Sequence, residues 1–411
     1  MTQYYDNLET RTVDQREQEL TLAVGKQLIN AKSNAVAYAD LLSGYDCESF
    51  SSLNDLESYP VTRKTDLINR QKSCPPLGGF ETFNRSQIRY INVSPGPVYE
   101  ACTHKPDFWR LARALFAAGF RGGDLVHNSF SYHLTPAGMM LDSGCHALGC
   151  GVIPGGVGQT EMQVQTIHDL KPDAYVGTPS FLKIVLEKAD ECQLDVSSIG
   201  KALVSGEALP PPLRGIFKDK GIAVLQAYAT ADLGVIAYET LPDTGLIIDE
   251  GVYVEIVRPG TGDRVADGEV GEVVVTSLNS DYPLIRFATG DMSTIVTGVS
   301  DCGRTNRRIK GWMGRADQTA KVRGMFIHPQ QINEVVRRHP EIIKARLIVD
   351  WIDHQDEITL HCEAEGHSLE LAESVGVSIR DLCKVRGDVV LVTPGSIVND
   401  GVVIEDIRQY E

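Results

Sequence analysis

The fold is decided by residues 124–206, where short apolar runs alternate with longer amphipathic runs. In order they read DLVHNSF (124–130), GMMLDSGCHALG (138–149), CGVIPG (150–155), TEMQVQTIHDL (160–170), AYVGT (174–178), SFLKIVLEKADEC (180–192) and KALVSG (201–206). The short runs have the length of buried strands, and the longer runs have helical spacing. The same alternation extends over about 87–235. It predicts a parallel sheet wrapped by helices.

The flanking regions have different patterns of apolar and polar residues. Residues 1–75 read as a helical lead-in, because apolar residues recur at helical spacing between polar caps and a proline break. Residues 246–298 change to short alternating runs with glycine-rich turns, which predict an antiparallel β subdomain. Residues 318–411 read as a small α+β domain. The expected class is therefore α/β, with a large N-terminal domain over 1–317 and a small domain over 318–411.

Composition limits the classes of function. A chain of 411 residues exceeds the size of one ordinary core and favours two domains. Its net charge of −16 argues against nucleic acid, whose binding needs clustered lysine and arginine. No apolar run approaches a membrane helix, and the N-terminus is polar and acidic, unlike a signal peptide. We expect no membrane partner and a cytoplasmic location.

The cysteines do not indicate a disulfide framework. There are nine, an odd number, widely scattered and without a CxxC pair. We expect reduced thiols that are mostly buried. A metal site from His133, Cys145, His146 and Cys150 is left open as the alternative to simple packing.

Four segments follow each other at suitable distances: SGEALP (205–210), QAYATADLG (226–234), PLIRFATGDM (283–292) and CGRTNRRIKGWMGRADQTAKVRGMFIHP (302–329). With them the chain resembles the phenylacetate-CoA ligase group of adenylate-forming enzymes, within the acyl-CoA synthetase superfamily. SLNDLESYPVTRKTDL (52–67) resembles the N-terminal region of that group, so the likeness covers essentially the whole chain. The resemblance implies a nucleotide- and acyl-binding domain with a mobile C-terminal lid.

The resemblance also implies a reaction. Such enzymes activate a carboxylic acid, here with an aromatic acid favoured, through acyl-AMP, and transfer it to CoA, using ATP and Mg²⁺. Tyr228 matches a ring that stacks on adenine, and Asp291 matches a carboxylate that accepts hydrogen bonds from ribose. A tyrosine that merely ends a core strand, and a plain turn at TGD, stay open. The matching nucleotide-binding positions are Ser205, Gly206, Glu207, Ala227, Tyr228, Ala229, Thr230, Asp291 and Arg315.

Four other positions carry implied roles at the catalytic acid and in the lid. Asp232 matches an acid that holds Mg²⁺ and serves catalysis, and Asp317 matches the hinge of the lid. Arg323 and Gly324 match the lid loop that meets the pantetheine of CoA.

The acyl group is expected at a strand end. Open α/β sheets bind ligands beyond the carboxyl ends of their strands. Tyr132, His133 and Gly138 follow such a strand and are our candidates for substrate contact. The alternative, that Tyr132 and His133 only cap a core strand, stays open.

The phosphate-handling positions depart from the family pattern. The expected glycine-rich phosphate loop with a lysine is replaced at 93–100 by VSPGPVYE, which loses N–H donors and gains a negative charge. Since the base and ribose positions remain, the split predicts an adenylate-shaped pocket that no longer needs ATP turnover. The altered residues are Pro95, Pro97 and Glu100 in the loop, Ala231 in place of a hydroxyl, and Val402 in place of a lysine.

Three hypotheses remain. The chain is an aryl- or acyl-CoA ligase, an ATP-independent acyl transferase, or a non-catalytic protein that binds adenylate or CoA. A serine hydrolase built on Ser205 is disfavoured because GxSxG is absent. The expected partner is a small carboxylic acid or acyl-CoA, with ATP or AMP, CoA and Mg²⁺ as implied cofactors. A homodimer is implied only by the frequent dimers of the family.

Overall fold

The computed structural model describes residues 3–94, 97–313, 315–316, 320–327, 329–352, 355–366, 368–398 and 402–409. The chain divides into two compact units, Met1–Leu209 with Arg214–Met313, and Pro210–Leu213 with Gly314–Glu411. Each unit has a hydrophobic core of its own.

Within the described residues, the first unit is built on a nine-stranded sheet in the order β14-β15-β10-β9-β8-β7-β6-β4-β5. Neighbours from β5 to β8 pair in parallel, and the remaining neighbours pair antiparallel. The α/β class is confirmed, although the antiparallel extension of this sheet was not predicted. The strands are β4 (Leu125–Asn128), β5 (Gly151–Pro154), β6 (Ala174–Gly177), β7 (Lys201–Val204), β8 (Ala223–Thr230), β9 (Gly234–Tyr238), β10 (Leu246–Ile248), β14 (Ile295–Val296) and β15 (Arg308–Ile309).

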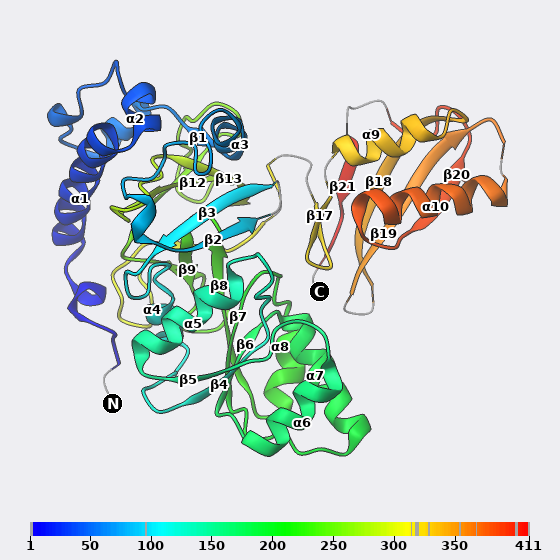
Figure 1. The fold of residues 1–411 in the computed structure, drawn as a ribbon, viewed down its shortest axis with the longest axis horizontal. Coiled ribbons are helices and arrows are strands. Elements are labelled where there is room, and N and C mark those ends of the chain that lie inside the picture. Colours follow the sequence, from blue (N-terminus) through cyan, green and yellow to red (C-terminus); the bar gives the residue numbers. More distant parts are fainter. Residues whose placement is uncertain are drawn as a thin grey trace. The chain divides into compact units, whose positions relative to one another are not determined.

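Helices flank the parallel strands. Helix α4 packs on α5 and α6 packs on α7, and Figure 1 shows α6 and α7 together beside β4–β7. All four residues of β6 are buried, as expected for a strand covered on both faces. Helix α4 begins at Leu111, because Arg110 is left-handed and the Asp107 carboxylate accepts the N–H groups of Leu111 and Ala112. The helices are α4 (Leu111–Ala117), α5 (Ala137–Leu148), α6 (Thr160–Leu170), α7 (Pro179–Cys192) and α8 (Pro211–Asp219).

A second sheet of the first unit has the order β1-β13-β12-β11. It divides the region expected as one β subdomain over 246–298, because β10 and β14 join the larger sheet instead. Every residue of β10 is buried, and this strand takes partners at both edges, β9 and β15. Strand β1 comes from the helical lead-in and pairs in parallel with β13. The strands are β1 (Thr62–Arg63), β11 (Val252–Val257), β12 (Gly271–Ser277) and β13 (Phe287–Ser293).

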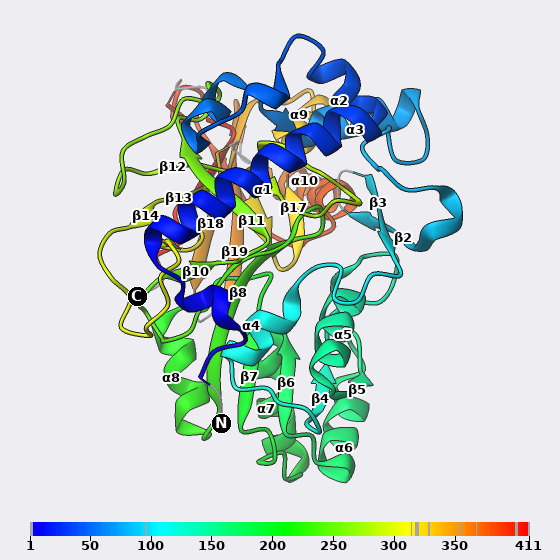
Figure 2. The same cartoon turned by 90° about the vertical axis from the view of Figure 1, so that its left-hand side faces the viewer.

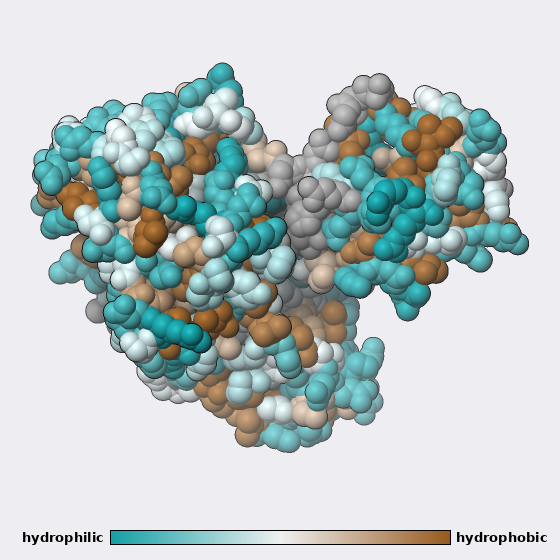
Figure 3. All heavy atoms as spheres, turned by 45° about the horizontal axis from the view of Figure 1, so that its top comes forward, coloured by the Kyte–Doolittle hydropathy of each residue, from teal (hydrophilic) through white to brown (hydrophobic). Residues whose placement is uncertain are grey.

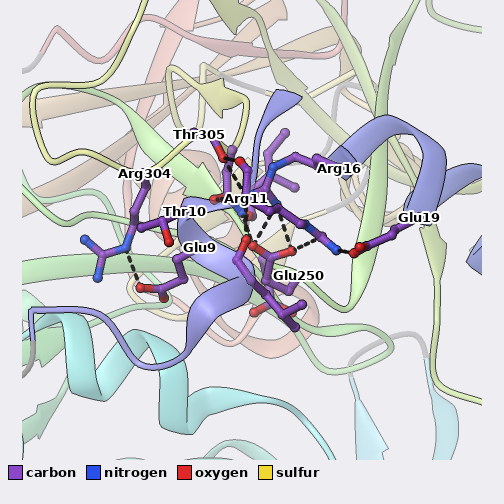
Figure 4. Close-up of polar contacts among 12 residues, drawn as sticks. Glu9, Thr10, Arg11, Arg16, Glu19, Glu250, Arg304 and Thr305 are labelled. Atoms are coloured by element: carbon purple, nitrogen blue, oxygen red, sulfur yellow. Dashed lines mark hydrogen bonds and ion pairs between the residues drawn. The ribbon is translucent and has the colours of Figure 1, made fainter. Parts of the chain in front are cut away.

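The N-terminal lead-in is mostly helical, with α1 (Val13–Asn34), α2 (Val36–Leu41) and α3 (Lys64–Ser73). A network of buried ion pairs ties its first residues to distant loops (Figure 4). Glu9 accepts from Arg304 at 3.0 Å, and Arg16 donates to Glu250 at 2.7 Å. These ion pairs are shielded from water and connect the lead-in to loops of the first unit. Helix α3 belongs to the same lead-in and carries Lys64 into the candidate site.

A separate hairpin in the first unit consists of β2 (Ile88–Ser94) and β3 (Val98–Thr103). The two strands pair antiparallel as far as Ser94 and Val98. The hairpin therefore contains most of the segment predicted as a phosphate loop, of which Pro95 and Gly96 lie outside the described residues.

The second unit contains a hairpin and a four-stranded sheet in the order β20-β19-β18-β21, drawn from yellow to red in Figure 1. Its core includes Leu347 and Leu360 of the sheet and Val375 and Ile379 of α10. The elements are β16 (Ala320–Val322), β17 (Met325–Ile327), α9 (Pro329–Arg338), β18 (Ile342–Ile352), β19 (Gln355–Ala364), α10 (Leu369–Cys383), β20 (Asp388–Val392) and β21 (Ile404–Asp406).

The surface mixes polar and apolar side chains. Figure 3 shows hydrophilic residues spread over the face that it draws, with hydrophobic residues, in brown, in separate groups between them.

In the part of the chain that the structure describes, no helix has the length and apolar character needed to cross a membrane. All nine cysteines are free, and all but Cys74 and Cys192 are buried.

Candidate functional site

The predicted base-binding residues meet where β7 and β8 end. Strand β7 pairs in parallel with β8 up to Val204 and Gln226, so the turn after β7 lies beside the end of β8. The Ser205 hydroxyl donates to the Ala227 carbonyl at 2.7 Å, which joins the two segments. Gly206 has a φ of +83°, a conformation that glycine adopts without strain, and it is exposed. The turn therefore brings a residue without a side chain next to the end of β8.

The Glu207 carboxylate and the Thr230 hydroxyl contact backbone. Glu207 accepts from the N–H of Ser180 at 3.3 Å, and Thr230 accepts from the N–H of Leu233 at 3.2 Å. Both contacts shape the strand ends. Ala229 and Thr230 belong to β8 and pair with β9, so their backbone is held in the sheet.

Tyr228, Asp291 and Trp312 form a hydrogen-bonded group that we call the Asp291 triad. The Tyr228 hydroxyl donates to Asp291 Oδ2 at 2.8 Å, and the Trp312 indole N–H donates to Asp291 Oδ1 at 3.1 Å. Asp291 is 9% exposed. Two ring donors on one carboxylate fix its orientation.

A second group, which we call the Lys64 cluster, consists of Lys64, Ser94, Glu100 and Asp232. The Lys64 ammonium lies 3.4 Å from Asp232 Oδ2 and 3.2 Å from the Ser94 hydroxyl. The Ser94 hydroxyl in turn donates to Glu100. These side chains come from α3, from both strands of the β2–β3 hairpin, and from the turn between β8 and β9. The cluster is the place where the phosphate loop and Mg²⁺ were predicted.

The charges of the Lys64 cluster are not balanced. Glu100 is buried, and its burial and the neighbouring Asp232 carboxylate raise the pKa of Glu100 well above the usual value for a glutamate, against the opposing effect of Lys64. Burial and the same two acids raise the pKa of Tyr282. One ammonium therefore lies beside two carboxyl groups, and Glu100 is the one whose pKa is raised.

The Lys64 cluster offers two carboxylate oxygens to a cation. Mg²⁺ takes one or two carboxylates and otherwise water and substrate phosphates, with octahedral geometry. Asp232 Oδ1 and Glu100 Oε2 are buried and have no hydrogen-bond partner among the described residues, so they would be the protein ligands, whereas Asp232 Oδ2 faces the Lys64 ammonium. Throughout the described ranges, no group of three or more His, Cys, Asp and Glu side chains is placed to hold a metal. His133, Cys145, His146 and Cys150, which the sequence left open as a metal site, are described and do not form such a group.

The predicted acyl-binding residues lie beyond β4. The Tyr132 hydroxyl donates to Asp142 at 2.7 Å, and Asn128 donates to the same carboxylate at 2.9 Å. A side chain at Gly138 would meet the Tyr132 ring at 2.9 Å, so the glycine allows this ring its position. His133 is exposed. Tyr132 thus turns its hydroxyl toward α5, and His133 faces solvent.

The predicted lid residues belong to the second unit. Arg323 and Gly324 join β16 to β17, both with positive φ. Arg323 contacts Asp356 through its backbone N–H and its guanidinium, each at 2.8 Å, so this loop is held within its own unit. The carbonyl of Val402, which stands in place of the expected lysine, accepts a hydrogen bond from Arg346 Nε at 3.1 Å. Arg315 is partly buried in this unit, and Asp317 lies outside the described residues.

Two site residues were missed by sequence reasoning. Trp312 stands in a segment that carried the resemblance, and its position three residues before Arg315 was the available signal. Lys64 follows β1, whose pairing of Arg63 with Ala288 sets it beside the strand that carries Asp291. No local pattern reveals that pairing, because more than 220 residues separate the two strands.

Comparisons with known proteins identify the family of the chain. A family model described as AMP-binding enzyme matches residues 131–279. A phenylacetate-coenzyme A ligase of Escherichia coli (strain K12) is 30% identical, and the alignment covers 95% of this chain and 94% of that protein. A phenylacetate-coenzyme A ligase of Aromatoleum evansii is 31% identical, with 78% of this chain and 74% of that protein covered.

A solved structure shares the fold. It is a 2-hydroxyisobutyryl-CoA ligase in complex with 2-HIB-AMP and CoA in the thioesterification state, with a TM-score of 0.86 and 23% identity. The match covers 100% of this chain and 93% of that chain. By sequence, the chain belongs to the phenylacetate-coenzyme A ligase family of AMP-binding enzymes.

Proposed function

We propose that this chain binds an acyl-adenylate and passes its acyl group to coenzyme A, with an aromatic acyl group favoured. The observation that carries this proposal is the Asp291 triad, in which the Tyr228 hydroxyl and the Trp312 indole orient one carboxylate. Members of the family are acid–thiol ligases that form acyl-AMP. The part of that chemistry best supported here is the handling of the adenylate.

The residues have separate tasks. Tyr228 stacks on adenine and Asp291 accepts from the ribose hydroxyls, so both hold the AMP portion while the acyl carbon reacts. Tyr132, His133 and Gly138 shape the acyl end. In the second unit, Arg315, Arg323 and Gly324 serve as a lid that brings CoA to the adenylate, with Asp317 as the hinge.

The transfer step is an acyl substitution. The CoA sulfur attacks the carbonyl carbon of the acyl-adenylate and forms the new C–S bond. The bond from that carbon to the phosphate oxygen breaks, AMP leaves with the electron pair, and the thiol proton passes to water. No oxidant, reductant or further nucleotide is needed.

The test supplies chemically made phenylacetyl-AMP and CoA, and measures phenylacetyl-CoA by chromatography. We expect thioester and AMP in equal amounts, and loss of the product when Tyr228 is changed to alanine. Binding of the adenylate without any thioester would instead identify a non-catalytic binding protein. An adenylate that neither binds nor reacts would overturn the proposal.

A complete ATP-dependent ligase is the second candidate. It is favoured by the alignment to the E. coli ligase, which spans almost the full length of both chains. This candidate predicts pyrophosphate release from Mg²⁺-ATP with at least one acid of a broad aromatic and aliphatic panel. Thioester formation from the adenylate without pyrophosphate release in that panel would decide for the first candidate.

A further inference from the structure

The Lys64 cluster contains two carboxyl groups, and each uses one of its oxygens inside the cluster. Asp232 Oδ2 lies 3.4 Å from the Lys64 ammonium, and Glu100 Oε1 accepts from the Ser94 hydroxyl. The other two oxygens, Asp232 Oδ1 and Glu100 Oε2, are buried and have no hydrogen-bond partner in the part of the chain that the structure describes. Because a buried carboxylate oxygen is costly without a partner, these two atoms indicate a ligand.

The two carboxyl groups lie beside each other, although they come from distant parts of the chain. The Lys64 ammonium contacts Asp232 and also lies 3.2 Å from the Ser94 hydroxyl, which bonds to Glu100. Burial raises the pKa of Glu100, and the adjacent Asp232 carboxylate raises it further. The Asp232 side chain and Glu100 are each 5% exposed. Two acids therefore meet in one place that water hardly reaches.

The Glu100 carboxyl group is held in this position by its hairpin. Helix α3 packs on β3 (Figure 1 and Figure 2). Gln71 of α3 donates to the Tyr99 carbonyl at 2.7 Å and accepts from the Tyr99 N–H at 2.9 Å. Since Tyr99 directly precedes Glu100, both bonds hold this part of β3 against the helix that begins with Lys64. Supporting contacts of this kind orient the ligands of a metal ion.

The described polar groups around the two acids do not balance their charge. Lys64 supplies one ammonium, on a side chain that is 36% exposed, against two carboxyl groups. Burial and both acids raise the pKa of the Tyr282 hydroxyl, and the Asn92 amide lies opposite Glu100 in the hairpin. Tyr282 OH and Asn92 Nδ2 are neutral, and they too are buried without a partner among the described residues. A hydrated cation would balance the acids, and the water around it can bond to both groups.

We propose that Glu100 and Asp232 together bind one hard divalent cation, such as Mg²⁺ or Mn²⁺, when no nucleotide is present. Carboxylate oxygens are the ligands that these cations prefer, and water can fill the remaining positions. Glu100 adds a second carboxylate to Asp232, so the cation does not need a phosphate to stay bound. The inference goes beyond the proposed acyl transfer, and its test uses no acyl group.

The test titrates MgCl₂ into the nucleotide-free chain by calorimetry, after metals are removed with EDTA and the EDTA is dialysed away. A buffer of physiological ionic strength screens the weak attraction of cations to a chain whose net charge is −16. We expect saturable binding of one Mg²⁺ per chain. Mn²⁺ should lose its free-ion electron paramagnetic resonance signal on binding, and excess Mg²⁺ should restore that signal by displacing it.

Two variants remove one charge each and nearly keep the shape of the side chain. Glu100→Gln and Asp232→Asn should each weaken nucleotide-free binding of Mg²⁺ at least about tenfold, because a single carboxylate then remains for the ion. Glu269→Gln, which changes an exposed glutamate, is the matched control and should bind like the natural chain.

Thermal melts separate lost binding from lost folding. Mg²⁺ should raise the melting temperature of the natural chain and of Glu269→Gln, but not that of Glu100→Gln or Asp232→Asn. In EDTA, Glu100→Gln should melt no lower than the natural chain, since the substitution removes repulsion between two buried acids.

Three results would overturn the cation site. They are the absence of saturable Mg²⁺ and Mn²⁺ binding to the natural chain, equal affinities of Glu100→Gln and the natural chain, and binding that appears only after AMP is added. Thioester formation from phenylacetyl-AMP in a chain that gives any of these results would leave the transfer function standing. Cation binding by a chain that does not react with the adenylate would leave the cation site standing.

Discussion

Tyr228 of the Asp291 triad lies in β8 and Asp232 of the Lys64 cluster follows that strand, but the charged groups of the two clusters are used differently. In the triad, two neutral ring donors orient a carboxylate. In the cluster, an ammonium faces a carboxylate, and a second carboxyl group is buried behind them. The comparison teaches that a carboxylate can be fully engaged by neutral ring donors in one cluster, while in the other a single ammonium leaves Asp232 Oδ1 and Glu100 Oε2 without a partner among the described residues.

The largest expected effect comes from removing the centre of the triad. Asp291→Ala takes away the acceptor of both ring donors and of the ribose hydroxyls, so AMP affinity should fall on the order of 100-fold, about two hydrogen bonds to a charged group. Calorimetry measures it, with Asp263→Ala as the control on an exposed loop. A change below threefold would contradict the assignment of the ribose to Asp291.

The next effect concerns the support of the cluster. Gln71→Ala removes two hydrogen bonds to the backbone of Tyr99, so the free energy of unfolding should fall by about 2 kcal/mol. Urea denaturation measures the loss, and Lys72→Ala controls for the helix. If Gln71→Ala unfolds at the same urea concentration as the natural chain, the hairpin does not depend on this anchor.

A smaller effect separates the ring of Tyr228 from its hydroxyl. Tyr228→Phe keeps the stacking surface and loses the bond to Asp291, so AMP affinity should drop by about fivefold, or about 1 kcal/mol. Ser94→Ala removes a hydroxyl from the Lys64 cluster in the same way. It should change AMP affinity by less than about twofold, because the Ser94 hydroxyl bonds to Lys64 and Glu100. Equal losses of AMP affinity in Tyr228→Phe and Ser94→Ala would mean that the Asp291 triad and the Lys64 cluster do not differ in their contact with the nucleotide.

The smallest expected effect is on folding stability, and it concerns Asp107, which belongs to neither the Asp291 triad nor the Lys64 cluster. Burial raises the pKa of Asp107 from 3.8 to about 6, so the folded state holds this proton more tightly than the unfolded state. The resulting stabilisation is complete below pH 3.8 and is lost as the pH rises through about 6. Melting temperatures at pH 5 and pH 7 should differ less in Asp107→Asn than in the natural chain, with AMP affinity unchanged.

Much of the first unit could be predicted because its signals are local. The run AYVGT became β6, and the amphipathic run at 180–192 lies within α7, since each carries the period of its own element. The β subdomain expected at 246–298 was less accurate. Pairing partners such as β15 at Arg308–Ile309 lie outside any window that a periodicity can test.

The sequence by itself determined the α/β class and the family, since each rests on residue types at fixed spacing, and it predicts the loss of an ordinary phosphate loop at 93–100. Only the tertiary structure decided which distant side chains meet. It brought Lys64 to Asp232 through the pairing of β1 with β13, and Trp312 to Asp291 through the return of the chain after β15. Contacts between residues far apart in the chain leave no periodic trace, because they are selected by packing of the whole unit.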